Sequence, residues 1–358
     1  MHFSLKRAVQ GGEDIRGYEL PSWTVLVMLI DILLLIPIIL VFEYTFKMIY
    51  PVFAMVEDEN PPAYEPVALH DQPADAEGGP GIGVTRNGFK PTRGQPRTVT
   101  SSFRAINRLL MANGGLGANF RGFSCFLVQA VLTSMAVGIF TSALGGVFYP
   151  VATLLASLTL VQLSTAWVHI VISEQSPLPF WSRLPPFRRT FDATWKAVTI
   201  YWLAREITRC IPVAVALVLG LELPKTGLAE PMDVGALDAA FVSKSLVVTL
   251  VTVACSVFVI IPAYVVLVRV QASLLPVEQS TIIPFDRSFE GSVEPEVVGG
   301  RGYATVTDAW LTFRKSSWRR LLTLYVKLFA LSLGAVLVCS AILVPQAILV
   351  AKYSKEAR

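Results

Sequence analysis

Six long apolar blocks limit what this chain can fold into. They cover residues 23–42, 120–144, 147–172, 197–219, 241–268 and 328–350, and the first block either ends at 42 or extends to 55. A helix needs about 20 mostly apolar residues to cross a bilayer. Unpaired backbone polar groups are too costly in lipid, so such spans must be helical. We therefore predict an all-α, multi-pass integral membrane protein with about six transmembrane helices in a lipid bilayer.

The composition between these blocks excludes several classes of protein. Only 16% of the residues are charged and the net charge is +4, which does not favour a nucleic-acid partner. The four cysteines lie in different apolar blocks, so we expect no disulfide framework and no metal site. With three histidines and none of the common hydrolase or metalloprotease motifs, the chain is not predicted to be an enzyme or to bind a cofactor.

The connections between the blocks differ in charge. Segments that follow the first, third and fifth blocks carry most of the lysines and arginines found outside the blocks. Loops rich in lysine and arginine usually stay on the inner side of a membrane. We therefore expect the three long loops to lie inside and both termini to lie outside.

The blocks divide the chain into six parts. These are an N-terminal tail (1–22), the first transmembrane helix (23–56) and a loop rich in Pro, Gly and acidic residues that is predicted to be disordered (57–100). Residues 101–172 hold a loop helix and spans two and three, joined at Gly145 and Gly146. Residues 173–268 hold a loop helix and spans four and five. Residues 269–358 hold a loop, a loop helix, span six and a short tail.

An internal repeat is suggested by the amphipathic stretches that precede the even-numbered blocks. In the first stretch, Phe103, Ile106 and Leu110 fall on one helical face. The second and third stretches contain Asp192 and Asp308, each followed by alanine, and Trp202 and Trp318 follow these aspartates at equal separation. We therefore predict three helix-pair repeats with short amphipathic loop helices, a layout typical of transporters.

At this point the chain resembles the mitochondrial carrier superfamily. The similarity is strongest in 103–110, followed by the glycine-rich stretch 114–122, and it includes 303–309 and 209–212. The carrier motif P-x-[DE]-x-x-[KR] is degenerate, because Pro276 and Glu278 keep only its first half. The resemblance implies a divergent carrier-like solute transporter of unknown substrate in a mitochondrial membrane.

Four polar residues within the spans are candidates for substrate binding. Asp31 lies deep in the first span, where a charge costs about 2.5–3.5 kcal/mol and so should face the bundle interior or water. Its role is either substrate binding or a structural pairing. By the resemblance, Arg209 is expected to contact a small anionic solute, although it could instead extend to the interface. Gln129 and Ser332 lie at similar depths in the other even-numbered spans.

A short motif in the first loop supports an alternative function. Pro61, Pro62 and Tyr64 form P-P-x-Y, the type of ligand whose polyproline helix docks on WW domains. A cytosolic loop would then recruit a WW-domain ubiquitin ligase. In this alternative the protein is a membrane scaffold or adaptor that does not transport, and it lies in a secretory-pathway or other cytosol-facing membrane.

Overall fold

The computed structural model describes residues 18–19, 21, 23–58, 98–221, 239–294, 296, 299–353 and 355–356, and this part of the chain is almost entirely helical. Four helical stretches are long and apolar enough to cross a membrane: Trp23–Val56, Gly117–Leu144, Ala239–Ser273 and Lys315–Val350. The pair Gly146–Thr159 and Val161–Ile172 is a fifth candidate if it counts as one span, because it is bent by 57°. The expected multi-pass helical class is therefore confirmed.

The first span is longer than its apolar centre. It consists of α1 (Trp23–Leu40), the π-helical segment η1 (Val41–Ile49) and α2 (Tyr50–Val56), which confirms the extension past residue 42. The fifth span is built in the same way from α8 (Ala239–Cys255), the π-helical segment η7 (Ser256–Ile260) and α9 (Ile261–Ser273). Pro51 and Pro262 stand at the second residue after these segments. A proline lacks the N–H group and crowds the preceding turn, which explains a local widening of the helix before it.

The second and third predicted spans form a helical hairpin. Helix α4 (Phe123–Leu144) is followed by the short turn η4 (Gly146–Phe148), α5 (Tyr149–Thr159) and α6 (Val161–Ile172). Gly145 has φ +93°, a backbone conformation that glycine adopts without steric cost, and this confirms the glycine turn. The bend between α5 and α6 falls at Leu160.

Two of the three predicted loop helices are separate helices in the described chain. Helix α3 (Phe103–Ala112) lies between the short turns η2 (Val99–Ser101) and η3 (Gly115–Phe120). Helix α10 (Val306–Leu311) begins with a capping box between Thr305 and Asp308 and precedes α11 (Lys315–Tyr353). The second stretch instead continues into the fourth predicted span as the 32-residue α7 (Phe187–Val218). No glycine or proline interrupts residues 187–211, so nothing ends the helix early.

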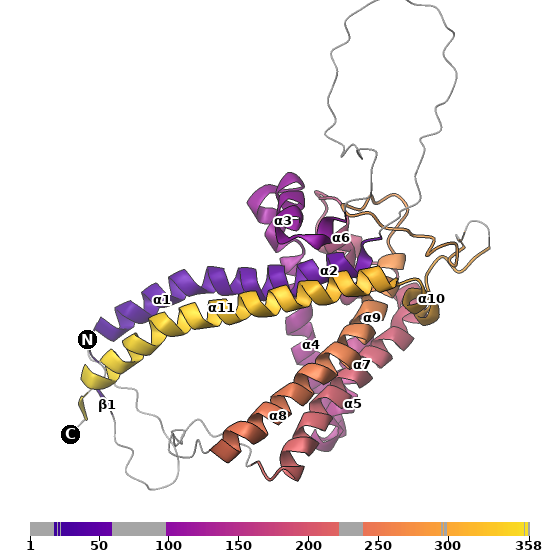
Figure 1. The fold of residues 1–358 in the computed structure, drawn as a ribbon. Coiled ribbons are helices and arrows are strands. Elements are labelled where there is room, and N and C mark those ends of the chain that lie inside the picture. Colours follow the sequence, from indigo (N-terminus) through magenta and orange to yellow (C-terminus); the bar gives the residue numbers. More distant parts are fainter. Residues whose placement is uncertain are drawn as a thin grey trace, which may run out of the picture.

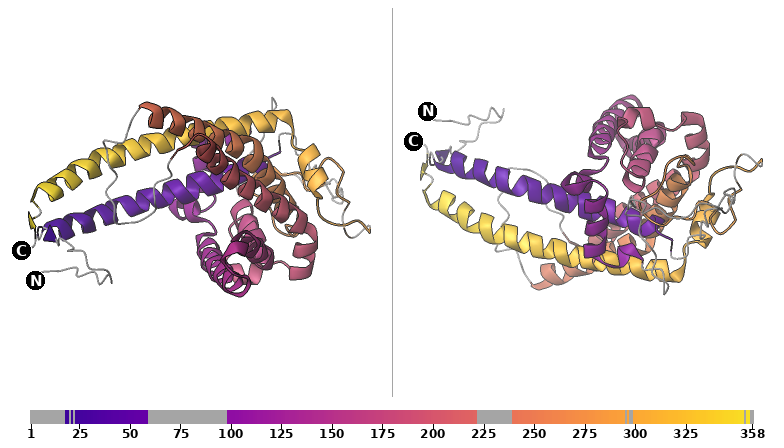
Figure 2. Two further views of the ribbon diagram at one scale, coloured as in Figure 1. Left: turned by 90° about the horizontal axis from the view of Figure 1, so that it is seen from below. Right: turned by 90° about the horizontal axis from the view of Figure 1, so that it is seen from above.

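Helix α7 is not among the stretches that are long and apolar enough to cross a membrane. It nevertheless lies against α5, α6, α8 and α9. Helix α11 packs against η1 and α2, and α1 and α11 run toward the same end of the molecule, where β1 (Tyr18–Glu19) and β2 (Lys355–Glu356) run antiparallel. The ends of α4, α5, α7 and α8 that lie lowest in Figure 1 point away from α1 and α11, and Figure 2 shows the same helices from below and from above.

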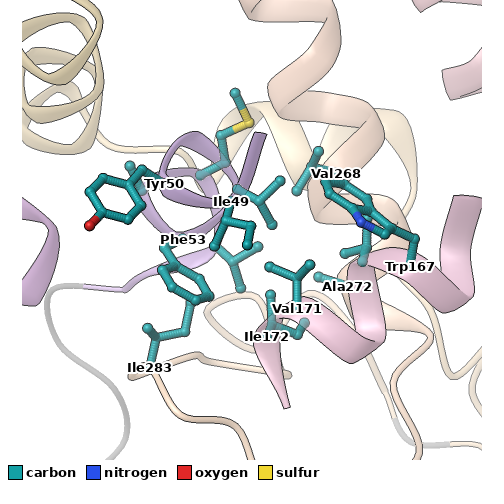
Figure 3. Close-up of a cluster of buried hydrophobic side chains, with 14 of the residues drawn as sticks. Ile49, Tyr50, Phe53, Trp167, Val171, Ile172, Val268, Ala272 and Ile283 are labelled. Atoms are coloured by element: carbon teal, nitrogen blue, oxygen red, sulfur yellow. The ribbon is translucent and has the colours of Figure 1, made fainter. Parts of the chain in front are cut away.

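The buried core lies at the end of the bundle that carries the long loops. Every residue of α2 is buried, and α2 meets α6 and α9 in the cluster shown in Figure 3. Its members include Phe53, Trp167, Ile172 and Val268. The outer parts of the helices are different, because α1 buries only Thr24 and α8 buries no residue. Packing therefore fixes the loop end of the molecule, and the apolar outer ends are left for lipid.

Candidate functional site

Arginines at the loop end bind backbone and side-chain oxygens where helices terminate. We call this end, made of η2, α3, η5 (Phe180–Arg183), α10 and the segment 274–305, the basic face. Arg121 donates to the carbonyl oxygen of Ser173, just after α6. Arg183 donates to Ser173 Oγ at 2.6 Å and to Gln279 Oε1 at 3.0 Å. Arg287 donates to the carbonyl oxygens of Pro276, at 2.8 Å, and Gln279. These contacts join α6, η5 and the segment after α9.

A cavity of about 710 Å³ opens among these elements. It lies between η5, the first turn of α7 and the segment that follows α9. Its polar lining includes Arg183, Arg189, Arg287, Glu278, Glu296 and His169. Arg189 forms an ion pair with Glu296, with 2.9 Å between Nη1 and Oε2. Burial lowers the pKa of the Arg183 and Arg287 guanidinium groups from their ordinary value, but arginine keeps its charge at neutral pH.

A chain of three polar groups, two of them fully buried, leads from this cavity into the bent third span. His169 is 1% exposed, and its Nε2 lies 2.9 Å from the carbonyl oxygen of Gln271. A carbonyl only accepts, so Nε2 must carry the hydrogen. The side chain of Gln271 donates in turn to Ser164 Oγ at 3.0 Å, near the bend at Leu160. We call His169, Gln271 and Ser164 the polar seam between α6 and α9.

Arg269 is a structural anchor rather than part of the cavity. It is 2% exposed, and its guanidinium carbon lies 4.9 Å from the ring centre of Phe289 and 5.4 Å from that of Phe313. Its Nη2 donates to Thr312 Oγ1 at 2.8 Å. Cation–π contacts of a desolvated arginine contribute about 2 kcal/mol or more. Arg269 thereby fixes the loop after α9 to the turn between α10 and α11.

Glu57 closes the base of the long first loop. It is 1% exposed and accepts hydrogen bonds from the Val99 amide and from the amide and hydroxyl of Thr100. Arg320 donates to its carbonyl oxygen at 3.0 Å. Of the loop 57–100 that was expected to be disordered, residues 57–58 and 98–100 are ordered and held together by this buried carboxylate, and residues 59–97 lie outside the described part of the chain. The P-P-x-Y residues Pro61, Pro62 and Tyr64 lie outside the described residues.

The four predicted substrate residues have separate surroundings. Asp31 Oδ1 accepts from Gln346 Nε2 of α11 at 3.2 Å. Arg209 is exposed and pairs with Glu206 of its own helix. Gln129 and Ser332 are partly buried on α4 and α11. None of the four lines the cavity, so their role in substrate binding stays a prediction.

Sequence reasoning did not connect the residues that the fold gathers at the basic face. Arg183 and Arg287 entered only as loop charges, and Gln271 had no assigned role. A histidine close to the end of an apolar block was the one signal that pointed to this region. The comparisons with protein families, with curated proteins and with solved structures gave no match.

Proposed function

We propose that the protein is a solute transporter whose pathway begins at the cavity of the basic face. The observation that carries this proposal is the polar seam, which continues from the cavity to the bend between α5 and α6. Buried polar and ionisable groups in membrane helices often mark solute or proton pathways. Many transporters build such sites around helices that are interrupted within the membrane.

The paired helices also support the proposed relation to mitochondrial carriers, and with it a mitochondrial membrane. The paired strands β1 and β2 lie at one end of the molecule, and α10 and the described connections around it lie at the other (Figure 1). A layout of three helix pairs would have this property. The pathway proposed here differs from the substrate residues predicted from the sequence, since it uses side chains of α6 and α9 instead of Asp31, Gln129 and Arg209.

Osmotic swelling of proteoliposomes tests transport for a protein whose substrate is unidentified. The full chain would be reconstituted and exposed to isosmotic solutions of acetate, hexanoate, phosphate and a neutral sugar. We expect faster swelling than in empty liposomes for at least one solute, and slower swelling for Gln271→Leu and Ser164→Ala. Asp31→Ala combined with Arg209→Ala should retain the wild-type rate. Swelling equal to that of empty liposomes in every solution would contradict transport.

A second candidate function is supported by the closed base of the first loop. Glu57 and Thr100 hold the two ends of the 59–97 segment together at the basic face. The P-P-x-Y motif begins three residues after Asp58, close to this anchor. We propose as the alternative that the protein is a scaffold or adaptor that recruits a WW-domain protein, such as a ubiquitin ligase.

A binding assay with an isolated WW domain tests the adaptor. Tyr64→Ala removes the ring that fills the groove of the domain and should abolish capture of the full chain. Pro80→Ala, in the same segment but outside the motif, should leave capture unchanged. Equal capture of the wild type and Tyr64→Ala would end the adaptor proposal.

A further inference from the structure

The cavity of the basic face has the charge and lining of a selective anion site. We infer that it binds a small monocarboxylate with an apolar body. This inference rests on the proposed function, since it names the solute class at the start of the pathway. The cavity, with its about 710 Å³, falls within the usual size range of small-molecule sites.

The charged residues that line the cavity leave it with one excess positive charge. Three arginines and two glutamates line it, and Arg189 is matched by Glu296 at 2.9 Å. Arg287 interacts electrostatically with Glu278. The described hydrogen bonds of Arg183 go to Ser173 and Gln279, which are both neutral. The charge of Arg183 is thus available to a single anionic group.

The start of α7 adds to the attraction. Pro186 precedes this helix and offers no side-chain cap, so the amide groups of the first turn lack intrahelical acceptors. Pro186 and Thr190 both line the cavity. The positive end of the helix dipole therefore favours an anion on the same side as Arg183.

The apolar part of the lining argues for a carboxylate rather than a free phosphate. It includes Leu184, Pro185, Leu274, Leu275, Val277 and Val293. A hydrocarbon body would be desolvated against these side chains. The planar guanidinium fork matches a carboxylate in two parallel hydrogen bonds. A phosphate would bring close to two charges against a single excess charge and would have nothing to place on the apolar wall.

Hexanoate is the probe that combines one carboxylate with an apolar body. The full chain in nanodiscs would be titrated with hexanoate while its thermal unfolding is followed by tryptophan fluorescence. A ligand that binds only the folded state raises the unfolding midpoint. We expect hexanoate to raise it in a saturable manner, hexylammonium to leave it unchanged, and phosphate to have a clearly smaller effect.

A negative charge introduced at the cavity wall distinguishes hexanoate binding in the cavity from non-specific effects of hexanoate on the protein. Arg183→Gln is the direct variant, but it removes contacts that hold the fold together. Val277 is 88% exposed and lines the cavity, so Val277→Asp adds a negative charge without removing a packed side chain. We expect the Kd for hexanoate to rise about tenfold, equal to about 1.4 kcal/mol. The neutral Val277→Asn should raise the Kd clearly less than Val277→Asp, and the remote Arg104→Gln, which does not line the cavity, should bind like the wild type.

The outcomes distinguish this inference from the transport proposal. No midpoint shift with hexanoate, an equal shift with phosphate, or unchanged binding by Val277→Asp would overturn the carboxylate site. Specific hexanoate binding without swelling of proteoliposomes would support the site and contradict transport. Swelling in a neutral sugar alone would support transport and contradict the carboxylate site.

Discussion

Arg320 Nε lies 3.5 Å from Glu57 Oε2, and this pair joins the end of the first span to the start of the last. The side chain of Glu57 is fully buried and that of Arg320 is 7% exposed. A buried carboxylate needs such partners, because an unpaired charge in the protein interior is costly. The same glutamate binds the amides of Val99 and Thr100. One residue therefore ties together the first span, the end of the first loop and α11.

Glu57→Ala should strongly destabilise the basic face. The substitution leaves Arg320 without its buried carboxylate and the amide of Thr100 without its acceptor, so we expect a loss of about 3–5 kcal/mol. Denaturant unfolding of the purified chain measures this loss. Glu43→Ala is the matched control, because Glu43 forms an exposed pair with Lys47 that contributes less than about 0.5 kcal/mol. Similar losses for the two variants would show that Glu57 is not an anchor.

Gly122→Ala should disturb the start of α4. Gly122 has φ +69°, and a Cβ atom there would lie 3.2 Å from Trp167 Cδ1 and 3.3 Å from Ile170 Cγ2. The left-handed backbone alone costs alanine about 1–2 kcal/mol, so we expect a loss of at least that size. Gly138→Ala, with no atom within 4 Å, should be neutral or stabilising by up to about 1 kcal/mol. Thermal unfolding of both variants decides whether the contact with Trp167 matters.

Acid should weaken the loop that covers Arg269. Burial raises the pKa of Asp286, but hydrogen bonds from Ser288 and Glu290 and the charge of Arg269 outweigh it and lower the pKa below the ordinary 3.8. A lowered folded-state pKa means that the carboxylate stabilises the fold above about pH 4 and that this contribution is lost as the pH falls further.

Asp286→Asn tests this dependence. The variant should be less stable at neutral pH and should lose less stability than the wild type between pH 5 and pH 3, the range around the ordinary aspartate pKa of 3.8. Unfolding curves at several pH values measure the slope. An identical acid slope in the two proteins would mean that Asp286 does not supply it.

The sequence predicted those parts of the fold that local physics decides. The lengths of the apolar blocks indicated where the helices lie. The extension of the first helix to Met55 and the turn at Gly145 were confirmed. The merged α7 was missed, because the repeat argument expected a break although no glycine or proline is present there. The bend at Leu160 depends on packing against α4, α7 and α9 and has no local signal in the sequence.

The candidate site could not be predicted for a related reason. His169 and Gln271 are 102 residues apart in the chain, and Arg183 and Gln279 are 96 apart. Their contacts follow from how α6, α9 and η5 pack, and no local periodicity encodes this. The sequence drew attention to Asp31 instead, since one charge in an apolar helix is visible without a fold.

Asp31 and Gln346 should behave as a coupled pair. Gln346→Leu removes the described hydrogen-bond donor to the charged Asp31 carboxylate, and the loss of a hydrogen bond to a charged group costs about 1.5–3 kcal/mol. The double variant Asp31→Leu with Gln346→Leu has no such charge, so we expect it to be at least as stable as the wild type. Unfolding in mixed detergent compares the variants. A double variant as unstable as Gln346→Leu would show that the pair is not coupled.

The arrangement of the chain ends predicts which sites a membrane-impermeant reagent can reach. Tyr18 pairs with Glu356 in the small sheet, so the start of α1 and the end of α11 lie on the same side. The basic face lies at the other end of the molecule (Figure 1). In a chain whose four cysteines are replaced by serine, Lys352→Cys and Ser292→Cys should be labelled from opposite sides of a sealed vesicle. By the distribution of lysine and arginine, Ser292→Cys is expected on the inside. Labelling of both positions from one side would contradict the predicted topology, and it would also remove the basis for placing the cavity at the inner end of a transport pathway.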